Sequence, residues 1–168
     1  MNRDLEPVGI RGWLILPAIG LVISPIWQGI GLVREIIPSL SPTLLKSLSD
    51  PTSAGYSPLW VPGILFEALG NILIFALTLW LAYLFFFRKS ALVPRLFIIW
   101  LVSHLVFQIL DWLLTRSLPI AAEQSGNGVS SSLGRTITNA AIWIPYFIWS
   151  TRVKNTFVDT ADRIAAKI

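Results

Sequence analysis

The sequence predicts an all-α, polytopic membrane protein, a bundle of four transmembrane helices with both chain ends in the cytoplasm. Hydrophobic residues make up 54% of the 168 residues and charged residues only 13%, about half the charged share of a soluble domain. Four apolar runs approach or exceed the ~20 residues that cross a bilayer core as a helix. Basic residues gather at the ends of these runs, where water rather than lipid surrounds them.

The first predicted span covers about residues 13–36. Prolines and glycines interrupt it, but a membrane helix keeps its backbone hydrogen bonds because lipid offers no other partner. An external loop, 37–58, follows. Within this loop, Ser41-Pro42 ahead of Thr43 to Leu48 predicts a short helix, since Ser favours the N-cap and Pro the first turn.

The fourth predicted span is the weakest, because it is a short apolar run that carries Thr138, Asn139 and Pro145. The tail places apolar residues at helical spacing among charges of both signs, which is typical of an amphipathic helix. This helix either continues the fourth span or binds a membrane surface or a partner. Within one membrane domain, 1–168, the predicted segments are spans 59–87, 94–116 and 133–152, the external loop 117–132 and the cytoplasmic tail 153–168.

The orientation follows from the basic residues on each side of the predicted spans. Nine lie on one side: Arg3, Arg11, Arg88, Lys89, Arg95, Arg152, Lys154, Arg163 and Lys167. Four lie on the other: Arg34, Lys46, Arg116 and Arg135. Positive charge stays preferentially in the cytoplasm, so both termini and the short loop after residue 88 are predicted to face inward.

The composition excludes several classes of protein. Without cysteine, the chain has no disulfide, thiolate catalysis or cysteine-ligated metal, and its single histidine, His104, cannot form bis-histidine haem alone. Its basic residues do not cluster on one face, which argues against nucleic-acid binding. No nucleophile, phosphate-loop or zinc-type motif is present. The sequence therefore leans away from an enzyme and predicts no catalytic residue, cofactor or metal.

Two predicted spans carry polar residues that lipid does not favour. Residues three and four apart share a helix face, so each span presents one polar stripe. Antiparallel packing would bring Glu67 level with Asp111 or Gln108, and Asn71 level with His104. We therefore predict a buried polar site of Glu67, Asn71, His104, Gln108 and Asp111. The stripes also include Thr78 in the second span and Thr115 in the third, and the first span offers Gly20, Ser24, Gln28 and Gly31 to the same interior.

The polar stripe has two interpretations. Its neutral members are typical of a hydrogen-bonded seam that fixes helix register. Its ionisable members instead indicate a function, because charge inside a membrane is costly. Two neighbouring carboxyls do not both ionise cheaply, so either one is protonated or Arg116 or Arg135 compensates them.

Two stretches of the sequence resemble a known family. The opening stretch, Gly9 to Pro17, is similar to the Gly-Gly-Trp-Leu signature that opens members of the domain-of-unknown-function 2569 family, YdgK-like bacterial inner-membrane proteins, although Arg11 stands where that pattern has glycine. The other matches are Trp143 to Phe147, Ser150 to Lys154 and Thr156-Phe157 at the closing signature, and Glu67, Gly70 and Asn71 in the second helix. The resemblance implies a four-helix, multi-pass protein of the bacterial inner (cytoplasmic) membrane, and it implies no established activity.

Three functions are compatible with these features. The first is an accessory, assembly or structural subunit of a membrane complex, with a homo-oligomer or a larger assembly as partner. The second is a small ion-coupled transporter or carrier that uses Glu67, His104 and Asp111. The third is a protein that binds lipid or another amphiphile, with loop 37–58 as a lid.

Overall fold

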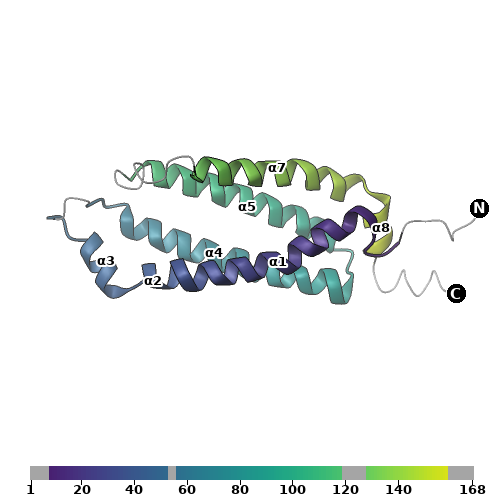
Figure 1. The fold of residues 1–168 in the computed structure, drawn as a ribbon, viewed down its shortest axis with the longest axis horizontal. Helices are drawn as coiled ribbons and strands as arrows, with labels where there is room; N and C mark the ends of the chain where they lie inside the picture. The colour runs from purple at the N-terminus through teal and green to yellow at the C-terminus, as the bar shows by residue number, and fades with distance from the viewer. Residues whose placement is uncertain (1–7, 53–55, 119–127, 159–168) are drawn as a thin grey trace, which may run out of the picture.

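Four long helices lie side by side along most of the length of the molecule (Figure 1). The computed structural model describes residues 8–52, 56–118 and 128–158, with side chains from residue 132 onward in the last range. Every regular element within these ranges is a helix.

The first helical stretch is continuous but changes its winding. The helix keeps Pro25 inside α1 and widens to a π-helical turn, η3, near its end. After it, α3 (Pro42–Leu48) forms where the sequence predicts a short helix, and Ser41 precedes it in an extended conformation without a side-chain capping bond. In order, the stretch contains η2 (Gly12–Leu14), α1 (Ile15–Gly31), η3 (Leu32–Ile36) and α2 (Ile37–Ser39).

The second and third long helices form a hairpin. The second long helix also ends in a π-helical turn, and Lys89 follows that turn in a left-handed conformation (φ 46°). Pro94 lies in the first turn of the third long helix, where its missing N–H is not needed. The elements are α4 (Trp60–Tyr83), η4 (Leu84–Arg88) and α5 (Val93–Arg116).

Three helical stretches within the described residues are long and apolar enough to cross a membrane. They are Gly12–Ser39, Trp60–Arg88 and Val93–Arg116, with 28, 29 and 24 residues. At 1.5 Å per residue, even the shortest measures about 36 Å, which exceeds the ~30 Å of a bilayer core.

The fourth long helix, α7 (Gly128–Trp149), starts earlier and ends sooner than the predicted span 133–152. It ends because Ser150 is extended (φ −66°, ψ 118°) and its side chain accepts a hydrogen bond from Val153 N. A separate short helix, α8 (Thr151–Thr156), follows. The tail therefore does not begin as a continuation of the fourth helix, and residues 159–168 of the predicted amphipathic tail lie outside the described residues.

The long helices form a row rather than a closed ring. α1 packs on α4, α4 on α5, and α5 on α7, and the last contact is the most extensive (Figure 1). α1 and α7, at the two ends of the row, share at most a marginal contact.

The hydrophobic core gathers at one end of the row. Phe97 of α5 stacks on Phe147 of α7, with ring centroids 3.9 Å apart and planes 6° from parallel. The ring centroids of Phe85 and Phe157, the residue that follows α8, lie 5.0 Å apart. The most buried members are Leu14, Leu21, Leu81, Phe85, Val93, Phe97, Phe147, Val153 and Phe157.

The beginning and the end of the described chain meet beside this core. Gly9 N donates a hydrogen bond to Thr156 Oγ1 at 2.9 Å, and Arg152 packs over Gly12. Gly9 (φ 86°) and Gly12 (φ 57°) both adopt the left-handed conformation that favours glycine. We call this end of the bundle, marked by Gly9 and Thr156, the terminal end, and the opposite end, marked by α3 and Arg116, the distal end.

Two glycines let α5 approach α4 closely. A Cβ at Gly63 would lie 3.1 Å from Leu114, and a Cβ at Gly70 would overlap the ring of Phe107. Phe66 also stacks on Phe107 at 5.3 Å. The seven-residue step from Gly63 to Gly70 therefore matches the step back from Leu114 to Phe107 and fixes an antiparallel register.

We predict that Gly70→Ala lowers the free energy of unfolding by about 1–3 kcal/mol, because the added methyl overpacks the contact with Phe107. The thermal unfolding midpoint in detergent, followed by circular dichroism, measures the change. Gly134→Ala is the matched control, since a Cβ at that helical glycine meets nothing within 4 Å. Adding Phe107→Leu should recover part of the loss; equal midpoints for Gly70→Ala and Gly134→Ala would contradict the close approach.

Candidate functional site

The inward face of α4 changes chemistry halfway along the helix. Its residues recur at alternating steps of four and three, which keeps them on one face. Towards the terminal end Thr78, Leu81 and Phe85 are fully buried (0% exposed). Towards the distal end Glu67 and Asn71 are only half-buried. The complete stripe is Glu67, Asn71, Ile74, Thr78, Leu81 and Phe85.

The inward face of α5 changes in the same way. Phe97 and Leu101, towards the terminal end, are 2% and 6% exposed. His104, Gln108 and Asp111, towards the distal end, are half-buried. The interior is therefore apolar and closed in its terminal half, and polar and less closed in its distal half.

The helix register places the two half-buried carboxyls, Glu67 and Asp111, at one level. Gly70 lies opposite Phe107, and three residues towards the distal end from each are Glu67 and Leu110. Asp111 is one residue further, an axial offset of about 1.5 Å. The charges of Asp111 and of Glu35 lie within electrostatic range of the Glu67 carboxyl, so the carboxyls repel one another when ionised.

No described cation neutralises this pair. Glu67 and Asp111 form no ion pair and accept no hydrogen bond from any residue that the structure describes. Arg116, which the sequence offers as a counter-charge, instead lies over the Trp112 ring, 4.2 Å from its centroid. Arg135, the other candidate, is exposed on α7.

Glu35 is a member of this group that sequence reasoning missed. It lies in the π-helical turn η3 and is exposed. Its position seven residues after Gln28 continues the inward stripe of the first helix, and that spacing is the signal that identifies it. Within the described part of the chain, the three carboxyls and His104 do not come close enough together to hold a metal ion.

The expected pairing of Asn71 with His104 does not form. Asn71 Nδ2 donates to Glu67 O of its own helix at 2.9 Å. The register places His104 opposite Leu73, about two residues deeper than Asn71, so the two side chains are offset. His104 packs edge-on against Trp100 at 4.9 Å, and its buried Nε2 has no hydrogen-bond partner among the described residues.

A buried hydroxyl joins three helices just below His104. Thr78 Oγ1 of α4 accepts from Trp100 Nε1 of α5 at 2.8 Å. It lies 2.7 Å from Ile74 O and 3.1 Å from Gln28 Oε1 of α1, and its single proton can serve only one of these acceptors at a time. This junction separates the polar half of the interior from the apolar half.

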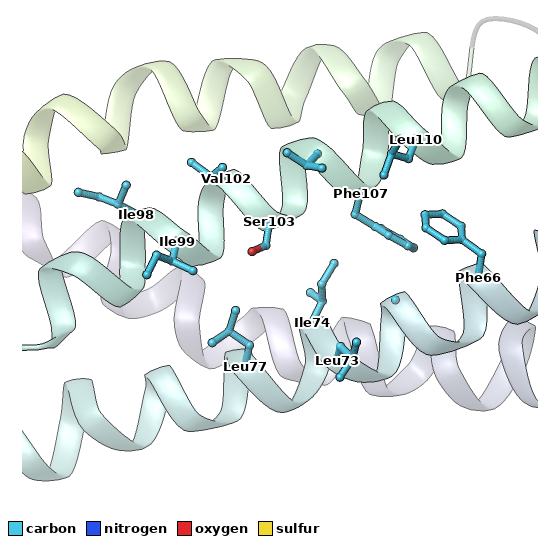
Figure 2. Close-up of a pocket in the computed structure, with 12 residues that line it drawn as sticks. Phe66, Leu73, Ile74, Leu77, Ile98, Ile99, Val102, Ser103, Phe107 and Leu110 are labelled. Atoms are coloured by element: carbon cyan, nitrogen blue, oxygen red, sulfur yellow. The ribbon is translucent and has the colours of Figure 1, made fainter.

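A second feature lies on the outside of the same helix pair. An apolar groove of about 520 Å³ follows the seam between α4 and α5 (Figure 2). Ser103 supplies the only hydroxyl among its lining residues, and Phe66, Leu73, Leu77, Ile99 and Phe107 are typical of the rest. Acyl chains are compatible with such a lining. The groove lies on the helix seam, whereas the sequence places an amphiphile site under loop 37–58.

Comparison with known proteins adds a family relationship. Residues 7–158 match the family described as "Protein of unknown function (DUF2569)". The chain is also 29% identical over 153 residues to "Inner membrane protein YdgK" of Escherichia coli (strain K12), a match that covers 91% of this chain and 96% of that protein. No solved structure matches the chain.

We predict that Thr78→Val destabilises the protein by about 0.6–1.7 kcal/mol, from the average to the largest value measured for hydrogen bonds between membrane helices. Valine keeps the shape of threonine but leaves Trp100 Nε1 without its acceptor. Thr78→Ser is the control because it keeps the hydroxyl. Thermal unfolding in detergent measures both variants; equal midpoints for the serine and valine variants would mean that the three-helix junction adds no stability.

Proposed function

The chain belongs to the DUF2569 family of membrane proteins, and from that premise we propose that it crosses the bacterial inner membrane four times with both ends in the cytoplasm. The hydrogen bond between Gly9 and Thr156 supports an even number of crossings. If only the three most apolar stretches crossed, these residues would lie on opposite sides of the bilayer. α7, with 22 residues, measures about 33 Å and is long enough to be the fourth span.

The distribution of charge supports the same orientation. Arg88, Lys89, Arg95 and Arg152 all belong to the terminal end, as does Lys154. Positive charge stays preferentially in the cytoplasm. The terminal end is therefore the cytoplasmic one, and the distal end faces outward.

Within this topology we propose that the protein is a small ion-coupled carrier whose outward half binds a proton or a small monovalent cation. The observation that carries the proposal is the pair of carboxyls, Glu67 and Asp111, at one level without a described counter-cation. A charge inside a membrane is costly unless something neutralises it. A proton shared by the pair, or a cation between the two groups, would supply that neutralisation.

His104 supports an ion-coupled role about two helical turns deeper than the carboxyl pair. Its Nε2 is buried and has no hydrogen-bond partner among the described residues, which leaves this nitrogen unoccupied on the polar stripe, although burial disfavours the charged imidazolium. Below it, Thr78 and the Phe97–Phe147 stack close the interior. On this proposal the polar half exchanges with the outward side only.

The two other predicted functions, an accessory role and lipid binding, differ in the structural support that they have. The accessory or assembly role stays a prediction, because it depends on partner proteins. Lipid binding is a second candidate, and the apolar groove between α4 and α5 is the observation in its favour. Native mass spectrometry of the purified protein, with Ser103→Phe to fill the groove, tests it: a retained lipid that the variant loses would support this candidate.

We predict that a thiol at position 108 reacts from outside the cell and that one at position 101 does not. The chain has no cysteine, so Gln108→Cys and Leu101→Cys each introduce a single thiol. The two positions lie seven residues apart on the same stripe of α5. The measurement is labelling by a membrane-impermeant maleimide on intact spheroplasts.

Leu101→Cys should react only after denaturation, which also confirms that its thiol is intact. Protection of both thiols would contradict an outward-open polar half. Reaction of both thiols from outside would place the closure deeper than Leu101.

We predict that Glu67→Gln abolishes pH-driven proton or cation flux into liposomes, because the amide cannot bind and release a proton. Purified protein is reconstituted with an internal pH-sensitive dye, and Na⁺ and K⁺ are tested in turn. Asp50→Asn is the control, since this exposed loop carboxyl bonds only to Thr52 among the described residues. Wild-type flux equal to that of empty liposomes, or unchanged flux in Glu67→Gln, would refute the carrier.

A further inference from the structure

A second cavity opens between the two ends of the helix row. It has a volume of about 240 Å³ and lies between α1, α5 and α7. Its floor is apolar and aromatic, formed by residues such as Phe97 and Leu101 of α5. Its rim is polar: Ser24 comes from α1 and Asn139 from α7.

The polar rim lies at the centre of the bilayer in the proposed topology. Asn139 is ten residues from Trp149, the end of α7, and so about 15 Å from the membrane surface. Ser24 is eleven residues from Trp13, or about 16 Å from the same surface. Both therefore lie near the midplane of a hydrocarbon core ~30 Å thick.

Lipid cannot satisfy these groups. Asn139 is exposed, and neither its amide nor the Ser24 hydroxyl has a hydrogen-bond partner among the residues that the structure describes. An amide that faces acyl chains loses all the hydrogen bonds that water or protein would give it. These two side chains therefore need hydrogen bonds from a polar group of another molecule at the bilayer centre.

The same face continues along α1 with a third polar group that has no described hydrogen-bond partner. Trp27 lies three residues after Ser24, is 68% exposed and makes no described hydrogen bond through its indole N–H. Its place, about 21 Å from the cytoplasmic surface, is deeper than the interfacial level that Trp prefers in contact with lipid. Exposed Trp away from that level is typical of protein interfaces.

We propose that this face of α1 and α7 is the contact between two copies of the chain, related by a two-fold axis that runs close to Asn139. A carboxamide carries both a donor and an acceptor, so two asparagines can pair with each other across such an axis. Gly20 and Ser24, four residues apart on α1, let a second copy approach closely. No charged residue lines the cavity, so like charges do not oppose the contact.

The second copy would also complete the carrier proposed above. The row of helices leaves at most a marginal contact between α1 and α7, and a neighbouring copy would cover the opening between them. This inference rests on the proposed crossing of α7.

The test is disulfide formation in native membranes. Asn139→Cys introduces the only thiol of the chain, and a two-fold axis beside it brings two such thiols together. We expect oxidation to give a covalent dimer on denaturing gels. Leu69→Cys is the matched control, because Leu69 is 60% exposed on α4, outside the proposed contact, and should remain monomeric.

A second measurement keeps the proposal falsifiable if the cysteine geometry is unfavourable. In mild detergent, native mass spectrometry should give a dimer for the wild type and for Asn139→Gln. Asn139→Leu should weaken dimerisation about tenfold, the effect of losing a hydrogen-bonded pair. Unchanged thermal unfolding at low protein concentration would show that the leucine variant still folds.

Other outcomes overturn the proposal. A wild-type monomer with lipid or a different protein bound would assign the face to that occupant, and equal cross-linking at positions 139 and 69 would indicate random collision. Failure of the proposed four-span topology gives a different result from failure of the dimer. In that case Thr151→Cys would react with an impermeant reagent from outside, whereas a failed dimer leaves that thiol reactive only from the cytoplasm.

Discussion

The close approach of α5 to α4 is the constraint on which the rest of the structure depends. Gly63 and Gly70 admit Leu114 and Phe107, and a register shifted by one turn would set these side chains against positions that carry a Cβ. This register places Glu67 beside Asp111 and brings Trp100 to Thr78. Backbone packing on the lipid-facing side of the hairpin therefore determines which polar groups meet on its inner side.

The two halves of the interior then differ for a physical reason. In the terminal half, stacked rings and aliphatic side chains exclude water, and the Gly9–Thr156 bond ties both ends of the chain to that packing. In the distal half, carboxyls that repel one another cannot be packed as tightly. A bundle closed at one end and loosened at the other offers access from one side, which is the requirement for a carrier in one of its two states.

Hydropathy alone predicted the helical class, the three most apolar stretches and the depth shared by Glu67 and Asp111, because burial in lipid depends on composition and helical rise. It could not predict the break at Ser150, since a capping hydroxyl competes with helix continuation only once α8 has a core to pack against. The Thr78 junction depends on rotation of three helices, which a one-dimensional pattern does not contain. Glu35 was missed because it lies beside Arg34 at the end of the predicted span 13–36, where a charged residue is not unusual.

The two outward faces of the row differ in the partner that each can accept. The α4–α5 groove is lined almost wholly by hydrocarbon, so bilayer lipid would fill it without loss of a hydrogen bond. In the proposed topology, the α1–α7 cleft carries an amide and a hydroxyl at the bilayer centre, where lipid has no group to offer them. Apolar surface in a membrane does not by itself indicate an interface, because lipid is as apolar as leucine. Unsatisfied polar surface does, and for this reason the cleft rather than the larger groove is the surface on which a second copy would bind.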